Sequence, residues 1–185
     1  MKSFLLFLFE VAKITVITLA IILPIRYFLM QPFFVKGASM EPNFEDGQYL
    51  IIDELSFRFR PVERGEVLVF RYPLDPAQYY IKRVIGLPAE TIEVADGKIK
   101  IQNAEHPLGF VLDESTYLPP TITTYGESKI TLGADEYFVM GDNRQASYDS
   151  RRWGILPGEN IIGRAWVRAW PVNLAKIFEA PQYSY

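Results

Sequence analysis

The chain of 185 residues contains one histidine and no cysteine, and its formal net charge is −3. The absence of cysteine excludes a thiol nucleophile, a disulfide framework and a zinc site built from cysteine and histidine. A net negative charge provides none of the basic footprint that nucleic-acid binding needs, so we expect no nucleic-acid partner.

Several common catalytic arrangements find no support in the sequence. A Ser-His-Asp triad would have to use His106, which lies in a polar stretch typical of a loop. Neither His-Glu-x-x-His nor Gly-x-x-x-x-Gly-Lys is present, so the motifs of a zinc peptidase and of a phosphate-binding loop are missing. We therefore expect no metal and no cofactor, and the chemistry is left to Ser, Lys, Tyr, Asp or Glu.

The N-terminal segment is apolar over residues 3–30 apart from Glu10, Lys13 and Arg26. Residues 11–30 alone make a stretch of 20 residues, which is about the length that crosses a hydrocarbon core. Glu10 and Lys13 are three positions apart and can pair on one face of a helix, which lowers the cost of placing them in lipid.

Two other interpretations of this segment are weaker. A cleaved secretory signal would be followed by small residues, which residues 28–32 do not provide. A buried helix of a soluble domain would be an odd place for three charges. We therefore expect residues 1–30 to be a single anchor helix in a lipid bilayer. The lysines and arginines at its two ends determine its orientation only weakly.

From residue 31 the pattern changes to short β-type runs separated by Pro, Gly, Asn and Asp. Asp96-Gly97 between two of these runs is a strong two-residue hairpin signal. We expect residues 31–185 to form an all-β domain, a partly closed antiparallel β-barrel-like fold. Residues 102–128 are polar and irregular, and we expect them to form a small cap on the far side. The expected strands are residues 49–52, 66–70, 79–85, 91–95, 98–101, 129–132, 136–140 and 161–170.

The first candidate for chemistry is Ser39, in the sequence Gly37-Ala38-Ser39-Met40-Glu41-Pro42. Gly37 lets the backbone approach another group closely. An exposed turn would explain the same residues taken alone. Since Ser39 follows the apolar segment by only nine residues, we expect it to lie within reach of a membrane-embedded substrate.

The second candidate is Lys82, in the strand-like run of residues 79–85. A serine hydroxyl is a poor nucleophile until a base takes its proton, and lysine can do so only when burial lowers its pKa. Side chains alternate along a strand, so Lys82 and Arg83 point to opposite faces. The competing interpretation is that both cations are solvated at a sheet edge.

The third candidate is the polar stretch of residues 141–151, which follows an apolar strand. An exposed loop would have the same composition. Asp149 and Arg151 are two apart and can pair, while Ser147 and Ser150 offer hydroxyls that could orient an ammonium group.

Four blocks in this order resemble the bacterial type I signal peptidases, the membrane-anchored Ser-Lys proteases that remove signal peptides from exported proteins. They are the Ser39 turn behind the anchor, residues 64–70 (Arg-Gly-Glu-Val-Leu-Val-Phe), residues 82–88 (Lys-Arg-Val-Ile-Gly-Leu-Pro) and residues 141–151. The resemblance covers nearly the whole chain, and the last two blocks are highly specific to the family.

The resemblance implies that Ser39 is the nucleophile and Lys82 the general base of an acyl transfer. The supporting residues that it implies lie on one loop: Ser147, which would hold the lysine amine by a hydrogen bond, Asp149 and Arg151, which would form an ion pair, and Asp142 and Arg144, which would brace the loop.

The substrate and oxyanion region would comprise Gly37, Ala38 and Met40. Some members have a serine at the position of Gly37, so we expect the backbone N–H of Ser39 to carry more of the oxyanion binding here. Asn43 stands where many relatives have threonine, and the short region before residue 137 implies a reduced cap.

The resemblance also implies the biological setting. Its substrates would be secretory preproteins with small residues, usually alanine, at positions −1 and −3. The enzyme would be a single-pass, monomeric protein of the plasma membrane with its catalytic domain on the extracytoplasmic side.

Two alternatives remain beside this hypothesis. A self-cleaving repressor-type Ser-Lys protease would carry a DNA-binding helical domain where this chain has an apolar segment. A catalytically inactive anchored domain that binds exported polypeptides would be expected to lack Ser39 or Lys82, and both are present.

Overall fold

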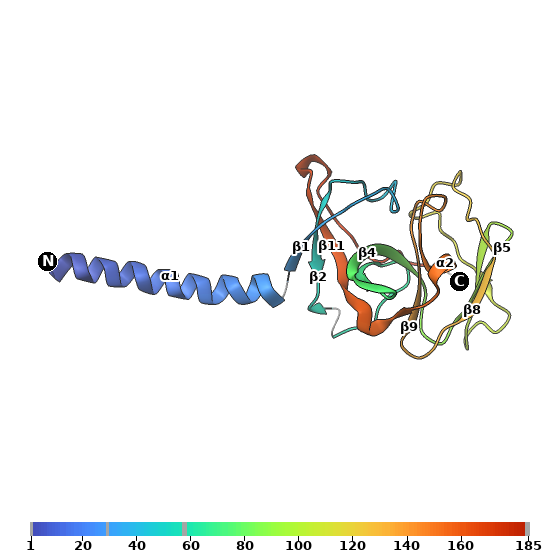
Figure 1. Cartoon of the computed structure of the whole chain (residues 1–185), viewed down its shortest axis with the longest axis horizontal. Helices are drawn as coiled ribbons and strands as arrows, with labels where there is room; N and C mark the ends of the chain where they lie inside the picture. The colour runs from blue at the N-terminus through green and yellow to red at the C-terminus, as the bar shows by residue number, and fades with distance from the viewer. Residues whose placement is uncertain (1, 29, 57–58, 184–185) are drawn as a thin grey trace.

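A computed structural model describes residues 2–28, 30–56 and 59–183 of the chain. Its first element is the helix α1 (Lys2–Phe28), which extends away from the β-rich remainder (Figure 1). Its stretch Phe4–Leu23 is long and apolar enough to cross a membrane, and none of it is buried inside the protein. Lys13 Nζ and Glu10 Oε2 are 2.7 Å apart, so the expected pair forms on this helix.

The larger of two sheets has the strand order β1-β2-β11-β3-β4-β9-β10, with β12 paired to β11, and every pairing is antiparallel. Its central strand β4 lies between β3 and β9. Its strands are β1 (Met30–Phe34), β2 (Tyr49–Asp53), β3 (Val67–Tyr72), β4 (Asp75–Gly86), β9 (Glu136–Met140), β10 (Leu156–Pro157), β11 (Ile161–Trp170) and β12 (Lys176–Ile177).

The smaller sheet has the order β7-β6-β5-β8. It lies at the end of the molecule opposite α1 (Figure 1). Asp96 and Gly97 connect β5 to β6 with φ values of 51° and 74°, which are the left-handed conformations that a two-residue hairpin of this type requires. The strands of this sheet are β5 (Thr91–Ala95), β6 (Lys98–Gln102), β7 (Phe110–Val111) and β8 (Ser128–Thr131).

The remaining elements are short: α2 (Ser150–Trp153), and the 3₁₀ turns η2 (Gly158–Asn160) and η3 (Val172–Leu174). A buried ion pair ties the turn before β3 to the connection between β4 and β5. The Arg64 guanidinium donates to both carboxylate oxygens of Glu90, at 2.8 and 2.6 Å. Two-point pairing of this kind fixes geometry as well as charge.

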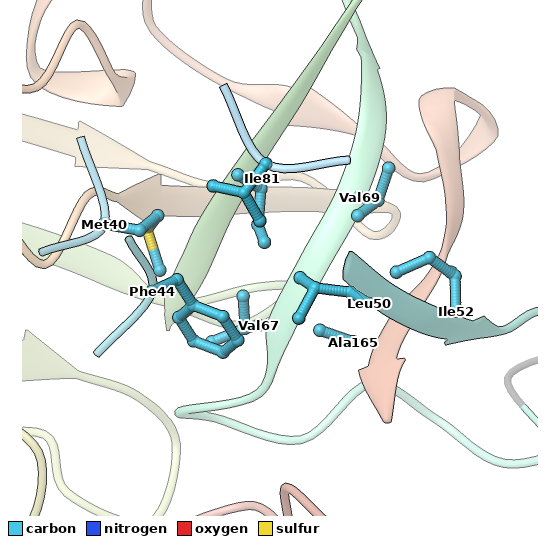
Figure 2. Packing of buried hydrophobic residues seen from close by; sticks show 9 residues of the cluster. Met40, Phe44, Leu50, Ile52, Val67, Val69, Ile81 and Ala165 are labelled. Atoms are coloured by element: carbon cyan, nitrogen blue, oxygen red, sulfur yellow. The ribbon is translucent and has the colours of Figure 1, made fainter. Parts of the chain in front are cut away.

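One apolar cluster lies beneath the turn that follows β1. Met40, Phe44, Leu50 and Ile52 are 0% exposed there. Figure 2 shows Met40 and Phe44 at one side of this cluster, with Ile81 of β4 nearby. Burial of such side chains stabilises by roughly 1.5–3 kcal/mol each, so the turn is anchored to the core at two points.

The predicted fold class is confirmed, since the described residues after α1 form antiparallel sheets that do not close into a barrel. The bounds expected for β5, β9 and β11 agree with the structure. The strand β1 was not among the expected strands, and it pairs with β2 over five residues.

The segment of residues 102–128 contributes β7 to the smaller sheet and also packs against the rest of the domain. Its residues Tyr117 and Leu118 are buried. The Tyr117 carbonyl accepts a hydrogen bond from Asn43 Nδ2 at 2.7 Å, and the Glu114 carboxylate pairs with Arg144. These polar contacts place the segment against the loop of residues 141–151.

Candidate active site

Ser39 lies in a tight turn between β1 and β2. The N–H of Glu41 donates to the carbonyl of Ala38 at 3.2 Å, and the N–H of Phe44 donates to that of Met40 at 2.9 Å. The Met40 side chain points into the core (Figure 2). The Met40 side chain is thus part of the core, and the expectation that Met40 belongs to the substrate region stays a prediction for its backbone.

Gly37 has φ +83°, and its N–H donates to Asp46 Oδ1 at 2.6 Å. This conformation favours glycine, so a serine at this position would have a strained backbone. Among the residues that the structure describes, none accepts the N–H of Ser39. That donor is free to bind an oxyanion.

Lys82 reaches Ser39 from β4. Its Nζ is 2.8 Å from Ser39 Oγ and donates to the carbonyl of Ile81, also at 2.8 Å. The residue is only 4% exposed. Burial lowers the pKa of Lys82 to about 8, and the negative charges of Asp149 and Asp142 oppose a further fall. A lysine with this pKa is partly neutral near pH 7–8 and can take a proton.

The loop after β9 begins beside this pair. β9 pairs with β4 through Met140 and Arg83, and the chain then turns at Gly141. A Cβ at Gly141 would collide with Ser147 Oγ and with the carbonyl oxygen of Ser39. Only glycine fits where the loop crosses the Ser39 turn this closely.

Asn143 joins the same loop to the Ser39 turn. Its N–H donates to the carbonyl of Ser39 and its Nδ2 to the carbonyl of Ala38, both at 3.1 Å. These bonds fix the backbone on either side of the Ser39 side chain.

Asp149 and Arg151 form the expected ion pair. Arg151 Nε and Nη2 each lie 2.8 Å from a carboxylate oxygen of Asp149, and the N–H of Gly141 donates to Asp149 Oδ2 at 3.0 Å. Burial raises the pKa of Asp149, but the Arg151 guanidinium and the N–H of Gly141 outweigh burial and lower it. The carboxylate is therefore held ionised.

Ser147 does not form the hydrogen bond to Lys82 that the resemblance implies. Its hydroxyl is buried beside Asp149, but it makes no hydrogen bond of normal geometry with any described residue. Lys82 Nζ instead donates to the carbonyl of Ile81, which lies next to it in β4.

Asp142 and Arg144 brace the loop through partners outside it. Arg83 Nε and Nη2 donate to the two carboxylate oxygens of Asp142 at 2.7 and 2.6 Å. Burial works against the charge of Arg83, but Asp142 outweighs it and the pKa of the guanidinium is raised. Arg144 pairs with Glu114 and hydrogen-bonds Thr124, so the loop is tied to the central strand and to the segment before β8.

Sequence reasoning missed three residues of this arrangement. Arg83 was considered only as the neighbour of Lys82, Asn143 only as part of a polar stretch, and Asn43 only as a position where many relatives have threonine. Asn43 Nδ2 donates to Asp142 Oδ2 at 2.9 Å and so connects the Ser39 turn to the Arg83 pair. The signal in the sequence was the density of polar residues around Asp142.

A groove of about 790 Å³ opens in front of Ser39 and Lys82. Residues 32–39 line one wall and residues 78–82 the other, and Ala146 and Tyr148 lie at the loop side. β9 pairs with β4 only from Arg83 onward, so the edge of β4 before Lys82 is open to the groove. An extended peptide can pair with such an edge.

His106 takes no part in this site. It lies between β6 and β7, where its ring packs edge-on against Phe110 with 5.1 Å between the centroids. Within the described parts of the chain no group of three or more histidine, aspartate or glutamate side chains is arranged to hold a metal ion.

Comparisons with known proteins place this arrangement in a family. The model of the signal peptidases, peptidase S26, matches residues 8–170. A probable signal peptidase I-2 of Synechocystis sp. is 38% identical over 169 residues, covering 88% of this chain and 73% of that protein. The signal peptidase I of Leptolyngbya laminosa is 37% identical over 185 residues, which cover 95% of this chain and 87% of that protein. The signal peptidase I of Pseudomonas aeruginosa is 32% identical over 198 residues, which cover 83% of this chain and 70% of that protein. The chain therefore belongs to the signal peptidase family, peptidase S26.

Proposed function

We propose that this chain is a membrane-anchored endopeptidase that removes signal peptides from secreted preproteins, with Ser39 as nucleophile and Lys82 as general base. The observation that carries the proposal is the 2.8 Å separation of Ser39 Oγ and Lys82 Nζ. The pKa of Lys82, lowered by burial to about 8, supports its role as a base at moderately alkaline pH.

The reaction would proceed by acyl transfer. Neutral Lys82 takes the proton of Ser39 Oγ as this oxygen attacks the scissile carbonyl carbon. The ammonium group then gives that proton to the leaving amine, the C–N bond breaks, and the signal peptide stays as an ester on Ser39. Lys82, neutral again, takes a proton from water as the water oxygen attacks the ester carbon. The bond to Ser39 Oγ then breaks, and Lys82 returns the proton to Ser39 Oγ, which releases the signal peptide as a carboxylic acid.

The oxyanion of each tetrahedral intermediate would be bound by the backbone N–H of Ser39. This donor has no competing acceptor among the described residues. The two bonds from Asn143 to the carbonyls of Ser39 and Ala38 support the role by holding the turn still, because such a donor is effective only when it is already in place.

The substrate would bind as an extended strand along the open edge of β4. Tyr80 and the Ser39 turn both line the groove beside the dyad, and the proposal expects them to accept small residues at −1 and −3. Ser39 follows the last residue of α1 by 11 positions, so a precursor still held in a bilayer could reach it. We propose that the protein is a monomer in the plasma membrane with the β domain on the extracytoplasmic side.

The proposal is tested by cleavage of a secretory precursor with alanine at −1 and −3, in detergent with the full chain. We expect Ser39→Ala and Lys82→Ala to lose turnover by at least about a thousandfold. The matched controls, Ser115→Ala and Lys129→Ala at exposed positions, should retain wild-type rates. A folded wild-type protein that cleaves nothing, or a Ser39→Ala variant that still cleaves, would contradict it.

A further inference from the structure

The family match ends at residue 170, yet the chain that follows packs closely against the candidate site. β12 pairs with β11 through Val167 and Arg168. The N–H of Phe178 then donates to the carbonyl of Trp166 at 2.8 Å. The tail, defined here as residues 171–183, is thereby fixed along β11.

Phe178 packs against the turn that carries Ser39. Its ring lies 4.5 Å from that of Phe44, centroid to centroid. Phe44 and Met40 are the two side chains that anchor this turn in the core, and Phe178 covers the same cluster from outside. The Phe178 ring therefore shields the support of the Ser39 turn from water.

Arg168 strengthens the same contact with polar bonds. Its Nη1 donates to the carbonyl of Asn43 at 3.0 Å, and its Nε donates to the carbonyl of Leu174 in the tail at 2.7 Å. Its guanidinium carbon lies 5.5 Å from the centre of the Phe178 ring. One side chain thus joins the end of the Ser39 turn to the tail.

The end of the tail reaches Gly65, whose N–H donates to the carbonyl of Val84 in the strand that carries Lys82, at 2.8 Å. A Cβ at Gly65 would come within 2.5 Å of Pro181 Cδ and 2.6 Å of the Tyr183 hydroxyl. The carbonyl of Gly65 accepts from Arg83 Nη1 at 2.7 Å. Pro181 and Tyr183 therefore lie against the residue that holds Arg83 from behind.

These contacts close a ring. Phe178 touches Phe44 next to Asn43, Asn43 binds Asp142, Asp142 binds Arg83, and Arg83 binds Gly65. The last residues of the tail cover Gly65 and complete the ring. Ser39 lies four residues before Asn43 and Lys82 directly before Arg83, so the ring passes through residues next to both members of the pair.

We infer that the tail of residues 171–183 is a positioning element that holds the Ser39 turn against the Lys82 strand, with Phe178 as its principal contact. The inference rests on the proposed roles of Ser39 and Lys82. Phe178 does not line the groove, and it acts through Phe44. Because proton transfer needs donor and acceptor within hydrogen-bond distance, small shifts of the turn reduce turnover more than they reduce substrate binding.

The test compares Phe178→Ala and Phe178→Leu with Gln182→Ala, an exposed tail position, in the full chain. We expect Phe178→Ala to lower kcat about tenfold with KM nearly unchanged, since other elements line the groove. Phe178→Leu should restore most of kcat, because it refills the space, and Gln182→Ala should match wild type. A kcat of Phe178→Ala within twofold of wild type would overturn the inference.

Two further readouts separate positioning from a general loss of folded protein. Amide hydrogen exchange should rise in residues 37–44 of Phe178→Ala while β5 and β6 keep their protection. The pH at half-maximal kcat should move upward, because water entering beside Lys82 relieves its burial. The groups that face Lys82 are unchanged in this variant: Asp142, Asp149, Tyr80 and Ser39. Unchanged exchange and an unchanged pH midpoint would overturn the inference whatever the loss of activity.

If wild type itself cleaves nothing, the proposed function fails. Hydrogen exchange at residues 37–44 of Phe178→Ala then still decides whether the tail holds the Ser39 turn.

Discussion

Arg83 and Asp142 form a buried two-point ion pair directly behind Lys82, with separations of 2.7 and 2.6 Å. Asp142 is 0% exposed and Arg83 only 6%. The pair also accepts a bond from Asn43, so it connects the central strand, the loop after β9 and the Ser39 turn. Removing one member of such a pair leaves a buried charge without compensation.

We predict that Asp142→Asn lowers the free energy of unfolding by about 3–5 kcal/mol, because it strands the buried guanidinium of Arg83. Urea unfolding of the purified full chain in detergent measures this loss. The control is Glu93→Gln, which breaks the exposed pair with Lys129 and should cost less than about 1 kcal/mol. Equal losses of unfolding free energy for the two substitutions would show that the buried Arg83 pair stabilises the fold no more than an exposed pair does.

Activity should rise with pH through the ionisation of Lys82. Because only the neutral amine can take the Ser39 proton, and its pKa is lowered to about 8, kcat/KM should increase about tenfold per pH unit below that value and level off above it. Initial rates between pH 6 and pH 10 measure the profile. A profile that is flat over this range would rule out a titrating amine as the base.

Lys82 should also reduce stability at neutral pH. Its pKa is about 8 in the folded protein and about 10.4 in the unfolded chain, so the unfolded chain holds the extra proton between these values. Stability contributed by this residue therefore falls as the pH falls from about 10.4 to about 8, by about 3 kcal/mol in all.

Lys82→Met should accordingly stabilise the fold at pH 7 by an amount of this order, and the gain should disappear above about pH 10.4. Urea unfolding at both pH values measures the difference. Lys129→Met, at a position whose side chain is 61% exposed, serves as control and should show no such pH dependence. A Lys82→Met variant less stable than wild type at pH 7 would contradict the claim that burial of the Lys82 ammonium destabilises the fold.

Ser147 and Ser150 offer a matched pair of buried hydroxyls. Ser150 Oγ accepts the N–H of Val139 at 3.0 Å, whereas Ser147 Oγ has no hydrogen bond with a described residue. We predict that Ser150→Ala costs about 1–2 kcal/mol of unfolding free energy, while Ser147→Ala costs nothing or stabilises slightly. Chemical unfolding of both variants measures these free energies. A larger loss for Ser147→Ala than for Ser150→Ala would mean that the Ser147 hydroxyl is hydrogen-bonded in solution.

Much of the fold could be predicted because local patterns agree with it. Alternating apolar residues marked β5 and β6, and Asp96-Gly97 marked the turn between them. β1 was missed because Pro32 and the apolar run of the anchor hide its alternation. β7, β10 and β12 are too short, at two residues each, to leave any periodic pattern.

The candidate site was predictable in its residue types but not in its contacts. The chemistry of serine and lysine singled out Ser39 and Lys82. Nothing local shows that Arg83 would be buried, since its partner Asp142 is 59 residues away. The role of Phe178 is equally hidden, because its contact with Phe44 joins segments that only the sheet brings together.

The central claim is that Ser39 carries the acyl group during turnover. The most direct measurement is acid quenching of the full-length wild-type protein during turnover of an alanine-containing precursor, followed by mass spectrometry of its peptides. The account predicts a signal-peptide ester on the peptide that contains Ser39, and none in Lys82→Met. An ester on any other residue would contradict it.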